Sequence, residues 1–452
     1  MYTHPIGSRY PAPYISSIWN FGNRTIVMRG LWISLASAQQ RLGVSAITDD
    51  MIREMETHKS DINTHTIHEY EKKYGHDIMA HIHAFGDLCP SAKKIIHNGV
   101  TSNFINDNTD SILIRDSMSH ISLLGEKLFD VLKSKSLAYL HMPTLAYTHL
   151  QPAQLITMGK RFTMWNADLY EDLKHIRTAI SQIPFRGVKG TVGTEDTMLK
   201  LFDGNHEKCT MINHILATEY AFGKVIPICG QTYSRKYDVE IFHRLSAICQ
   251  TIYKIANDLR LLASHSLVRE YFTEHQVGSS AMPYKQNPIH LEQICSLCRY
   301  VIGQESVISQ TYINQWLERS LDDSAVKRII YPECFMLVEY ILTTTIDTIR
   351  KLVVNEDVAR EQVYMKMQYV LSEEIMIRGV KMGYDRQMLH ETIRKLLIHK
   401  ENDDTSTDKH LLDIYKSDET LKRIIEEGGI HLNPHDYIGR CVEQVRNFYS
   451  GL

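Results

Sequence analysis

The stretch IFHRLSAICQTIYKIANDLRLL, residues 241–262, carries aliphatic side chains at alternating intervals of four and three positions. These side chains are Ile241, Leu245, Ile248, Ile252, Ile255, Leu259 and Leu262. The heptad stripe is typical of a helix that packs one face into a bundle. A similar face extends from Val338 to Leu352. The two stretches predict long, near-parallel helices.

The twelve prolines leave long proline-free spans, among them 91–142, 228–282, 289–331 and 333–433. Since proline breaks helix interiors, such spans can hold long helices. Alternation with a period of two residues is almost absent, and the short run Val225–Cys229 is the best candidate for a strand. The predicted fold class is all-α.

We expect three domains along the chain. Residues 1–111 hold shorter helices and loops, residues 112–364 hold the long helices, and residues 365–452 are helical again. The polar run 399–408 is predicted to be a solvated loop.

Three segments carry more aliphatic surface than a single bundle requires. They are residues 232–265, 289–315 and 333–353. Because an apolar stripe must be covered, we infer that these faces are buried between subunits of an oligomer.

Composition restricts the class of protein. The 452 residues are 43% hydrophobic and 23% charged, with a net charge of −3, which suits a soluble globular protein and gives no reason to expect nucleic-acid or membrane partners. No signal peptide or membrane span is expected, and the eight scattered cysteines favour a reducing, cytoplasmic location. Cys295 and Cys298 form a CxxC within a helical pattern, which we interpret as buried thiols.

The stretch GSSAMPYKQNP, residues 278–288, combines hydroxyl groups, a lysine and an amide. Asn287 suits a helix N-cap and Pro288 the first helical position, so a helix is predicted to start at 288. Hydroxyls and the Lys285 cation would then lie at a helix N-terminus, which favours an anion. The alternative is an ordinary polar loop before a capped helix.

Two histidine segments are candidates for chemistry. His149 lies between Thr148 and a Leu-Gln-Pro segment, where hydrogen-bonding neighbours could orient it as a general acid or base. The alternative is a structural or surface histidine. His76 precedes Asp77, with His81 and His83 following. This spacing is not that of a zinc helix, so no metal site is expected.

Several polar segments could bind an anion. Ser324 and Arg328 are four residues apart in the Arg319–Arg328 block and would share a helix face. A charged surface helix would explain the block equally. The glycine-rich loop Arg186–Thr194 lacks the ending of a P-loop but could place backbone N–H groups against a ligand. The polar run Thr101–Asp110 either caps a helix or contributes to a site.

The stretch 278–288 resembles the GSSxMPxKxNP signature of the fumarase/aspartase superfamily. A fuller match, over nearly the whole chain, resembles the adenylosuccinate lyase family. The matching segments are Ser8–Tyr10, His76–His81, Thr101–Ser102, Asp107–Asp110, Thr148–Gln154, Arg186–Thr194, Gly230–Tyr233 and Trp316–Arg328.

The resemblance implies a three-domain all-α fold whose central bundle assembles into a tetrameric helical core. It implies anti β-elimination of fumarate from adenylosuccinate, giving AMP, and from the succinylated imidazole-carboxamide ribotide SAICAR, giving AICAR, in purine nucleotide biosynthesis. Each active site would combine residues from three subunits of a homotetramer. Neither a cofactor nor a metal is expected.

The resemblance also implies roles for residues. Ser279 would be the base, acting as an alkoxide, and His149 the acid that protonates the leaving purine N6. Lys285 and Asn287 would stabilise the aci-carboxylate that forms. The implied substrate-binding residues are Arg9, Tyr10, His76, Asp77, Thr101, Ser102, Thr148, Gln231, Lys285, Asn287, Arg319, Ser324 and Arg328.

Three positions depart from the family pattern. Gly75, Gln286 and Gln293 stand where relatives often carry a basic residue. A lost charged hydrogen bond would weaken binding by roughly 1–3 kcal/mol. We hypothesise that Gln293 lowers activity on SAICAR.

Two other interpretations compete with this one. A sister lyase that releases fumarate from argininosuccinate, malate or aspartate would not need the Arg319–Arg328 block, because these substrates carry no phosphate. A non-catalytic helical bundle would not need Ser279, Lys285 and His149. The glycine and paired serines of residues 263–285 suggest a mobile lid over the site.

Overall fold

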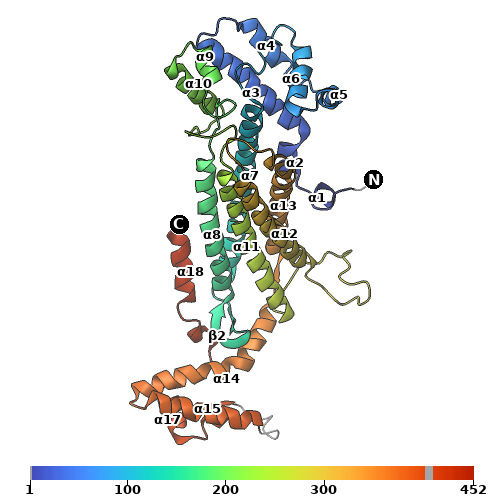
Figure 1. Cartoon of the computed structure of the whole chain (residues 1–452). Coiled ribbons are helices and arrows are strands. Elements are labelled where there is room, and N and C mark those ends of the chain that lie inside the picture. Colours follow the sequence, from blue (N-terminus) through green and yellow to red (C-terminus); the bar gives the residue numbers. More distant parts are fainter. Residues whose placement is uncertain (1–2, 403–410) are drawn as a thin grey trace. The chain divides into compact units, whose positions relative to one another are not determined.

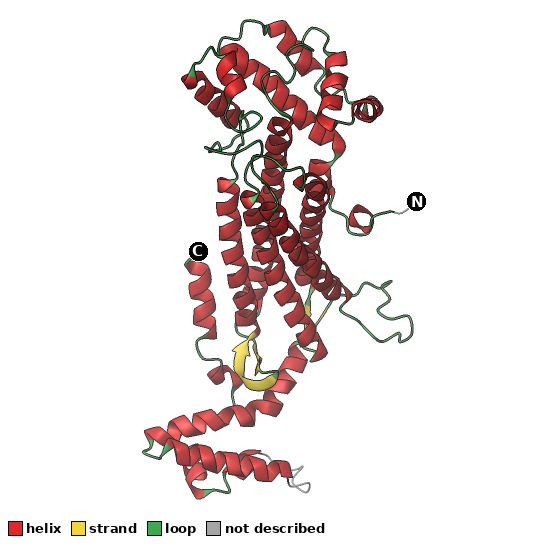
Figure 2. Ribbon diagram, viewed as in Figure 1, coloured by secondary structure: helices red, strands yellow, loops and turns green. Residues whose placement is uncertain are grey.

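The computed structural model describes residues 3–402 and 411–452. It is built mostly from helices, as predicted (Figure 2). Five long helices dominate the chain (Figure 1): α7 (Ser102–Ala138), α8 (Met158–Gln182), α11 (Lys236–Ser264), α12 (Ile289–Ile313) and α13 (Asp323–Lys351).

The remaining elements are shorter, except α14, which has 26 residues. Before α7 lie α1 (Pro5–Ser8), α2 (Pro13–Trp19), α3 (Phe21–Arg41), α4 (Asp49–Thr57), α5 (Thr64–Tyr74) and α6 (Asp77–Leu88). Between the long helices lie β1 (Pro143–Thr148), β2 (Gln151–Thr157), α9 (Asp196–Leu201), α10 (His206–Glu219) and β3 (Val268–Arg269). The chain continues with β4 (Val353–Val354), α14 (Glu356–Lys381), α15 (Arg386–Asn402), α16 (Leu411–Tyr415), α17 (Glu419–Glu427), the 3₁₀ helix η1 (Pro434–Tyr437) and α18 (Cys441–Ser450).

All seven side chains of the heptad stripe on α11 are buried, as the stripe predicts. Neighbouring helices approach closely along it. A Cβ atom added to Gly125 of α7 would lie 2.5 Å from Leu173 of α8 and 3.6 Å from Ile248 of α11. Tight packing of this kind leaves no room for a larger residue at 125.

Two helix boundaries differ from expectation. The helix after the signature stretch begins at Ile289, one residue later than predicted. Pro332 lies inside α13 rather than at its start. The lost hydrogen bond to the carbonyl of Arg328 is tolerated because the rest of a 29-residue helix, largely buried, holds the segment.

Strands are few among the described residues, as predicted, but the choice of Val225–Cys229 as the best strand candidate was wrong. β1 and β2 form an antiparallel hairpin, whereas the favoured run Val225–Cys229 contributes only an isolated bridge between Phe185 and Val225. Leu145 and Leu155 of the hairpin belong to a buried cluster with α14, α15 and α17. Tertiary packing, rather than a strong local pattern, therefore explains the hairpin.

The chain divides into two compact units. Unit 1 comprises Met1–Leu128, Asp168–Asn257 and His290–Asp347, and unit 2 comprises Phe129–Ala167, Asp258–Ile289 and Thr348–Leu452. Residue 111 lies within α7 and residue 364 within α14. The three-domain division with these boundaries stays a prediction.

Part of the predicted polar loop 399–408 belongs to α15, which extends to Asn402, and residues 403–408 lie outside the described residues. The eight cysteines are free, and Cys295 and Cys298 are buried thiols, as expected.

Helix α13 is the one helix among the described residues that is long and apolar enough to cross a membrane. Its most apolar window is 61% buried within the structure, as in the core helix of a soluble protein. This property is weak support for a membrane span.

Candidate active site

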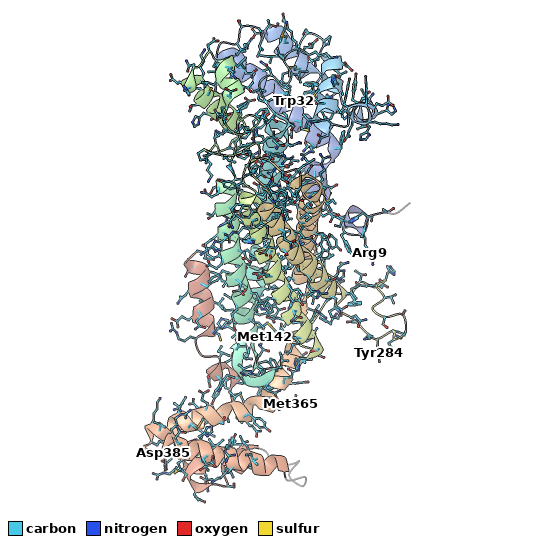
Figure 3. The ribbon with its side chains drawn as sticks, viewed as in Figure 1. Arg9, Trp32, Met142, Tyr284, Met365 and Asp385 are labelled. Carbon is cyan, nitrogen blue, oxygen red and sulfur yellow. The ribbon has the colours of Figure 1, made fainter. Side chains whose placement is uncertain are left out.

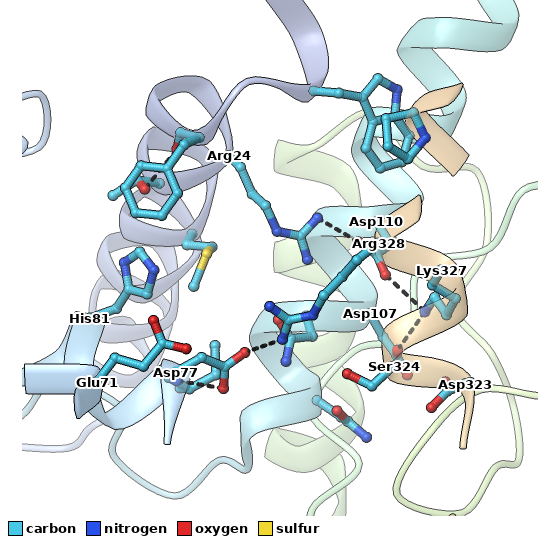
Figure 4. A pocket seen from close by; sticks show the side chains of 18 of the residues that line it. Arg24, Glu71, Asp77, His81, Asp107, Asp110, Asp323, Ser324, Lys327 and Arg328 are labelled. Carbon is cyan, nitrogen blue, oxygen red and sulfur yellow. Dashed lines mark hydrogen bonds and ion pairs between the residues drawn. The ribbon is translucent and has the colours of Figure 1, made fainter. Parts of the chain in front are cut away.

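A cavity of about 320 Å³ in unit 1 gathers residues from five distant parts of the chain (Figure 4). Four predicted site residues line it: Asp77, Arg319, Ser324 and Arg328. Ser324 and Arg328 lie on the first turns of α13, where their i, i+4 spacing puts both on the cavity side. The cavity therefore brings these four predicted residues together, while their roles stay a prediction.

Asp77 is the first residue of α6 and holds Arg328 in place. Its Oδ2 accepts a hydrogen bond from Arg328 Nη2 at 2.5 Å, and its Oδ1 accepts one from the Ile78 N–H. Burial raises the pKa of Asp77, but these hydrogen bonds and the Arg328 charge outweigh it and lower the pKa below its usual value. The carboxylate therefore stays ionised, and Arg328 faces the cavity in a defined position.

His76 is the N-cap of α6. Its Nδ1 accepts a hydrogen bond from the Met79 N–H at 3.4 Å. An accepting Nδ1 leaves the ring proton on Nε2, where it can be donated to a ligand or another side chain. The half-exposed ring suits such a role.

The glycine at position 75, one of the departures from the family pattern, is explained by the local backbone conformation. It caps the C-terminus of α5 with φ of 62° and donates its N–H to Glu71 O at 2.8 Å. A larger residue would be strained in this left-handed conformation.

A buried ionic network forms the floor of the cavity. Arg235 Nε donates to Asp323 Oδ2 at 2.7 Å, and its Nη2 donates to Asp107 Oδ1 at 2.8 Å. Asp323 also accepts a hydrogen bond from Arg319 Nη1 at 3.0 Å. Arg319 is thus oriented from beneath by a buried carboxylate, while its own side chain remains partly accessible.

A second part of the network surrounds Asp110. Lys327 Nζ lies 2.8 Å from its Oδ2, and Arg24 Nη1 donates to its Oδ1 at 2.7 Å (Figure 4). Burial would raise the pKa of Asp110, but the two cations keep it well below its usual value. Sequence reasoning missed Arg24, Lys327 and Arg235 as site residues, because ion pairs between distant segments leave no local pattern.

Two further cavity residues were not predicted. His81 is buried against the Phe21 ring, with ring centroids 5.6 Å apart, and burial lowers its pKa to about 4. Asn103 is buried, and its Nδ2 has no hydrogen-bond partner within the described part of the chain. Since buried donors are nearly always paired, Asn103 is available to a ligand in the cavity.

Tyr10 belongs to a series of three side chains in contact outside the cavity. Its ring packs against Tyr340 with centroids 5.3 Å apart, and the Tyr340 hydroxyl donates to Gln293 Oε1 at 2.8 Å. Arg9 next to it is exposed (Figure 3). Gln293, the third departure from the family pattern, therefore supports Tyr10 through Tyr340.

Three more predicted residues lie in unit 1 and, like Arg9, Tyr10 and His76, do not line the cavity. Thr101 and Ser102 form the start of α7, where Thr101 O accepts a hydrogen bond from the Phe104 N–H. Gln231 donates its N–H to Glu318 O at 2.9 Å, which joins its loop to the segment before Arg319.

Ser279 lies in the loop between β3 and α12. Its Oγ accepts hydrogen bonds from the N–H groups of Met282 at 3.1 Å and Ala281 at 3.4 Å. Oγ thus already faces two positive N–H dipoles, the kind of environment that favours an alkoxide. Lys285 is exposed.

The same loop folds back on itself at Gly278, whose carbonyl accepts a hydrogen bond from Asn287 Nδ2 at 3.0 Å. A Cβ atom at 278 would lie 2.3 Å from Lys285 O and 3.2 Å from the Cα of Gln286. Only glycine allows this approach, which brings both ends of the signature together. Figure 3 shows Tyr284 within this extended loop.

His149 occupies the tip of the β1–β2 hairpin. Thr148 pairs with Gln151, so the loop consists of His149 and Leu150, with φ of 52° and 60°. Such two-residue turns normally use Asn or Gly, and other residues pay about 1–2 kcal/mol each in the left-handed conformation. Strain at an exposed tip points to a functional constraint on the histidine.

The described residues show no bond between the predicted acid and the predicted base. No hydrogen bond or ion pair within residues 3–402 and 411–452 links His149 to Ser279 or Lys285. The residues that line the cavity all belong to unit 1, whereas His149, Ser279, Lys285 and Asn287 belong to unit 2. No cluster of three or more His, Cys, Asp or Glu side chains in the searched residues could hold a metal ion.

Comparison with known proteins agrees with these features. A family model described as lyase matches residues 29–303. The adenylosuccinate lyases of Saccharomyces cerevisiae and Schizosaccharomyces pombe are 39% and 37% identical to the chain, each over 99% of the chain and 94% of the relative. The 3-carboxy-cis,cis-muconate lactonizing enzyme of Pseudomonas putida shares the fold, with a TM-score of 0.84 at 20% identity over 99% of this chain and 98% of that one. The chain therefore belongs to the adenylosuccinate lyase family.

Proposed function

We propose that the chain converts adenylosuccinate to AMP and fumarate by anti β-elimination. The observation that carries this proposal is the cavity in which Arg319, Ser324 and Arg328 converge. Two guanidinium groups and a hydroxyl suit the phosphate of a nucleotide, and each arginine is already oriented by a carboxylate. The membership of the family supports the same substrate.

The reaction needs a base, an acid and a stabilised anion. Ser279 removes the proton from the carbon next to a succinyl carboxylate, giving an aci-carboxylate that Lys285 and Asn287 stabilise together with the N-terminus of α12. The electron pair then forms the double bond of fumarate as the C–N bond breaks. His149 protonates the departing N6 of the purine, which balances the proton taken by Ser279.

The other predicted residues bind the substrate. His76, with its proton on Nε2, orients His149, while Thr101, Ser102 and Gln231 contact the succinyl group and Thr148 supports the hairpin tip. Arg9 and Tyr10 contact the nucleotide, and the unpaired Asn103 Nδ2 donates to a substrate oxygen.

We further propose a homotetramer in which subunits share each site. A shared site would explain why His149 and the Ser279 loop make no hydrogen bond or ion pair to one another within the described residues. Trp316, Leu317 and Leu321, which flank Arg319, are 67%, 95% and 73% exposed. Large exposed apolar side chains beside a phosphate site indicate an interaction surface, and a second copy of this chain would bury them.

We place the enzyme in the cytosol and assign it AICAR formation from SAICAR as a second activity. Free cysteines agree with a reducing compartment. Because SAICAR carries the same succinyl and phosphate groups, one site can take both.

The direct test follows the loss of adenylosuccinate absorbance together with the appearance of fumarate. Ser279→Ala and His149→Ala should each lower kcat by at least 10²-fold, the usual contribution of a general base or acid. Activity on argininosuccinate and not on adenylosuccinate would favour the sister lyase. Activity on neither substrate would favour the non-catalytic bundle.

Sharing of the site has its own test. Mixed oligomers of Ser279→Ala and His149→Ala should regain activity, because some sites would then contain an intact residue of each kind. Mixtures that stay as inactive as either variant, despite exchange of subunits, would contradict a shared site.

A further inference from the structure

Helix α13 carries a buried carboxylate in an apolar stretch. Glu339 is 5% exposed, and it is the only charged residue in the sequence from 334 to 346. A buried charge costs free energy unless it is paired or hydrogen-bonded. Since an apolar residue of similar size would serve the packing of α13 equally well, the reason for a carboxylate at 339 lies in the groups that it binds.

Glu339 binds the first turn of α2. Its Oε2 accepts a hydrogen bond from the Ile15 N–H at 2.8 Å, and its Oε1 accepts one from the Tyr14 N–H at 3.2 Å. The first N–H groups of a helix have no partner within that helix, and Ala12 at the N-cap has no side chain that could accept them. Glu339 therefore supplies, across 324 residues of sequence, the acceptors that α2 lacks.

His120 of α7 supports the same contact. Its ring is stacked on the Tyr14 ring with centroids 4.0 Å apart, and its Nε2 lies 3.6 Å from Glu339 Oε1. Burial acts to raise the pKa of Glu339, but the interaction with His120 and the two backbone hydrogen bonds outweigh it and lower the pKa below its usual value. The carboxylate is therefore ionised at neutral pH.

The segment before α2 forms a closed turn that ends at Arg9 and Tyr10. Tyr10 donates its N–H to Pro5 O, and its own carbonyl accepts the Gly7 N–H, each at 3.1 Å. The link from this turn to α2 is Pro-Ala-Pro, residues 11–13, which is stiff because each proline fixes its φ. Holding the first turn of α2 therefore also restrains the turn that carries Arg9 and Tyr10.

Helix α13 contacts the closed turn directly at two further points. His4 Nε2 lies 3.3 Å from Glu333 Oε1, and the Tyr10 ring packs against Tyr340, which follows Glu339 in the chain. Two turns of α13 thus contact residues 4–15, while the first turns of the same helix line the active-site cavity. One helix therefore sets the position of the closed turn relative to the phosphate-binding residues that it carries itself.

We propose that Glu339 is a positioning residue for nucleotide binding, which acts by fixing the turn that carries Arg9 and Tyr10. The inference rests on the function proposed above, in which these two residues contact the nucleotide. Glu339 contributes to substrate affinity and little to bond breaking, because the nucleotide is not the part of the substrate from which the proton is removed.

Glu339→Gln tests this role, because an amide offers one oxygen and turns its NH₂ group toward a backbone donor. Hydrogen exchange of the peptide covering residues 10–19 should become roughly tenfold faster. KM for adenylosuccinate and the inhibition constant of AMP should both rise roughly tenfold, whereas kcat and the inhibition constant of fumarate, which has no nucleotide part, should stay within about threefold. Glu427→Gln, at an exposed glutamate of α17 paired with Arg423, is the matched control and should change none of them.

Glu339→Met keeps the test decisive if the amide prevents folding, since methionine places no unpaired polar group at 339. It should raise the same two constants. An equal rise for fumarate, or a fall in kcat together with the melting temperature, would show that Glu339 serves only the fold and would overturn the role. Unchanged KM despite faster exchange would overturn it as well. If the unmodified chain did not act on adenylosuccinate, the proposed function would fail and the positioning role with it.

Discussion

The carboxylate of Asp77 and the guanidinium of Arg328 form an ion pair, 2.5 Å between Oδ2 and Nη2, across 251 residues of sequence. The pair joins the first residue of α6 to the second turn of α13. Arg328 is consequently held at the cavity before any ligand arrives, which lowers the entropy lost on binding.

Arg328→Gln should raise KM for adenylosuccinate by roughly 10- to 100-fold, since a hydrogen bond to a charged group is worth about 1.5–3 kcal/mol. The effect on kcat should be smaller, because the phosphate is remote from the bond that breaks. Steady-state kinetics measure both. Arg394→Gln, which removes an exposed arginine of α15 paired with Glu391, is the matched control and should leave KM unchanged.

Gly278→Ala should lower kcat at least tenfold with little change in the melting temperature. The added Cβ would meet Lys285 O and Phe272, so the Ser279 loop must open while the helices remain intact. Gly223→Ala, where a Cβ has nothing within 4 Å, is the control and should behave as the unmodified enzyme. A large fall in melting temperature for Gly278→Ala would show instead that the loop supports the fold.

Stability should fall as the pH falls from about 6.5 to about 4, in part through His81. Burial lowers its pKa to about 4 in the folded protein, so in this window the unfolded chain binds the proton that the folded chain excludes. The loss of stability approaches roughly 3 kcal/mol below pH 4. Urea unfolding at constant protein concentration measures it. His81→Gln should flatten the pH dependence, whereas His65→Gln, at an exposed site, should not.

Gln293→Arg should raise kcat/KM for SAICAR relative to that for adenylosuccinate. The hypothesis that Gln293 lowers activity on SAICAR now has a structural route, because Gln293 accepts the Tyr340 hydroxyl and Tyr340 packs on Tyr10. Gln293→Leu removes the hydrogen bond from Tyr340 without adding a charge. It therefore separates the effect of the lost hydrogen bond from the effect of the arginine's positive charge. An unchanged ratio in both variants would sink the hypothesis.

The long helices could be predicted because their apolar residues recur with the helical period, as they do from Ile241 to Leu262. The position of Ser324 and Arg328 on one side of a helix, both lining one cavity, could be predicted for the same reason. Arg235, by contrast, meets Asp107 and Asp323 across 128 and 88 residues. Such pairs depend on the packing of whole helices, which no local pattern encodes.

The β1–β2 hairpin escaped prediction because its turn lacks the usual signal. A two-residue hairpin normally shows Asn-Gly or a related pair, and His149-Leu150 is neither. The catalytic role proposed for His149 would account for a turn residue that local preference disfavours. Pro332 gives the opposite case. The sequence alone predicts a helix boundary at this proline, but α13 continues through it.

The placement of the cysteines has a practical consequence. Seven of the eight are buried, and Cys229 is half-buried with a pKa that burial raises, so the native thiols should react slowly with maleimides. A cysteine introduced at the exposed Tyr284 would then take a fluorescent label almost alone. Its emission could report in real time whether the signature loop closes when substrate is added.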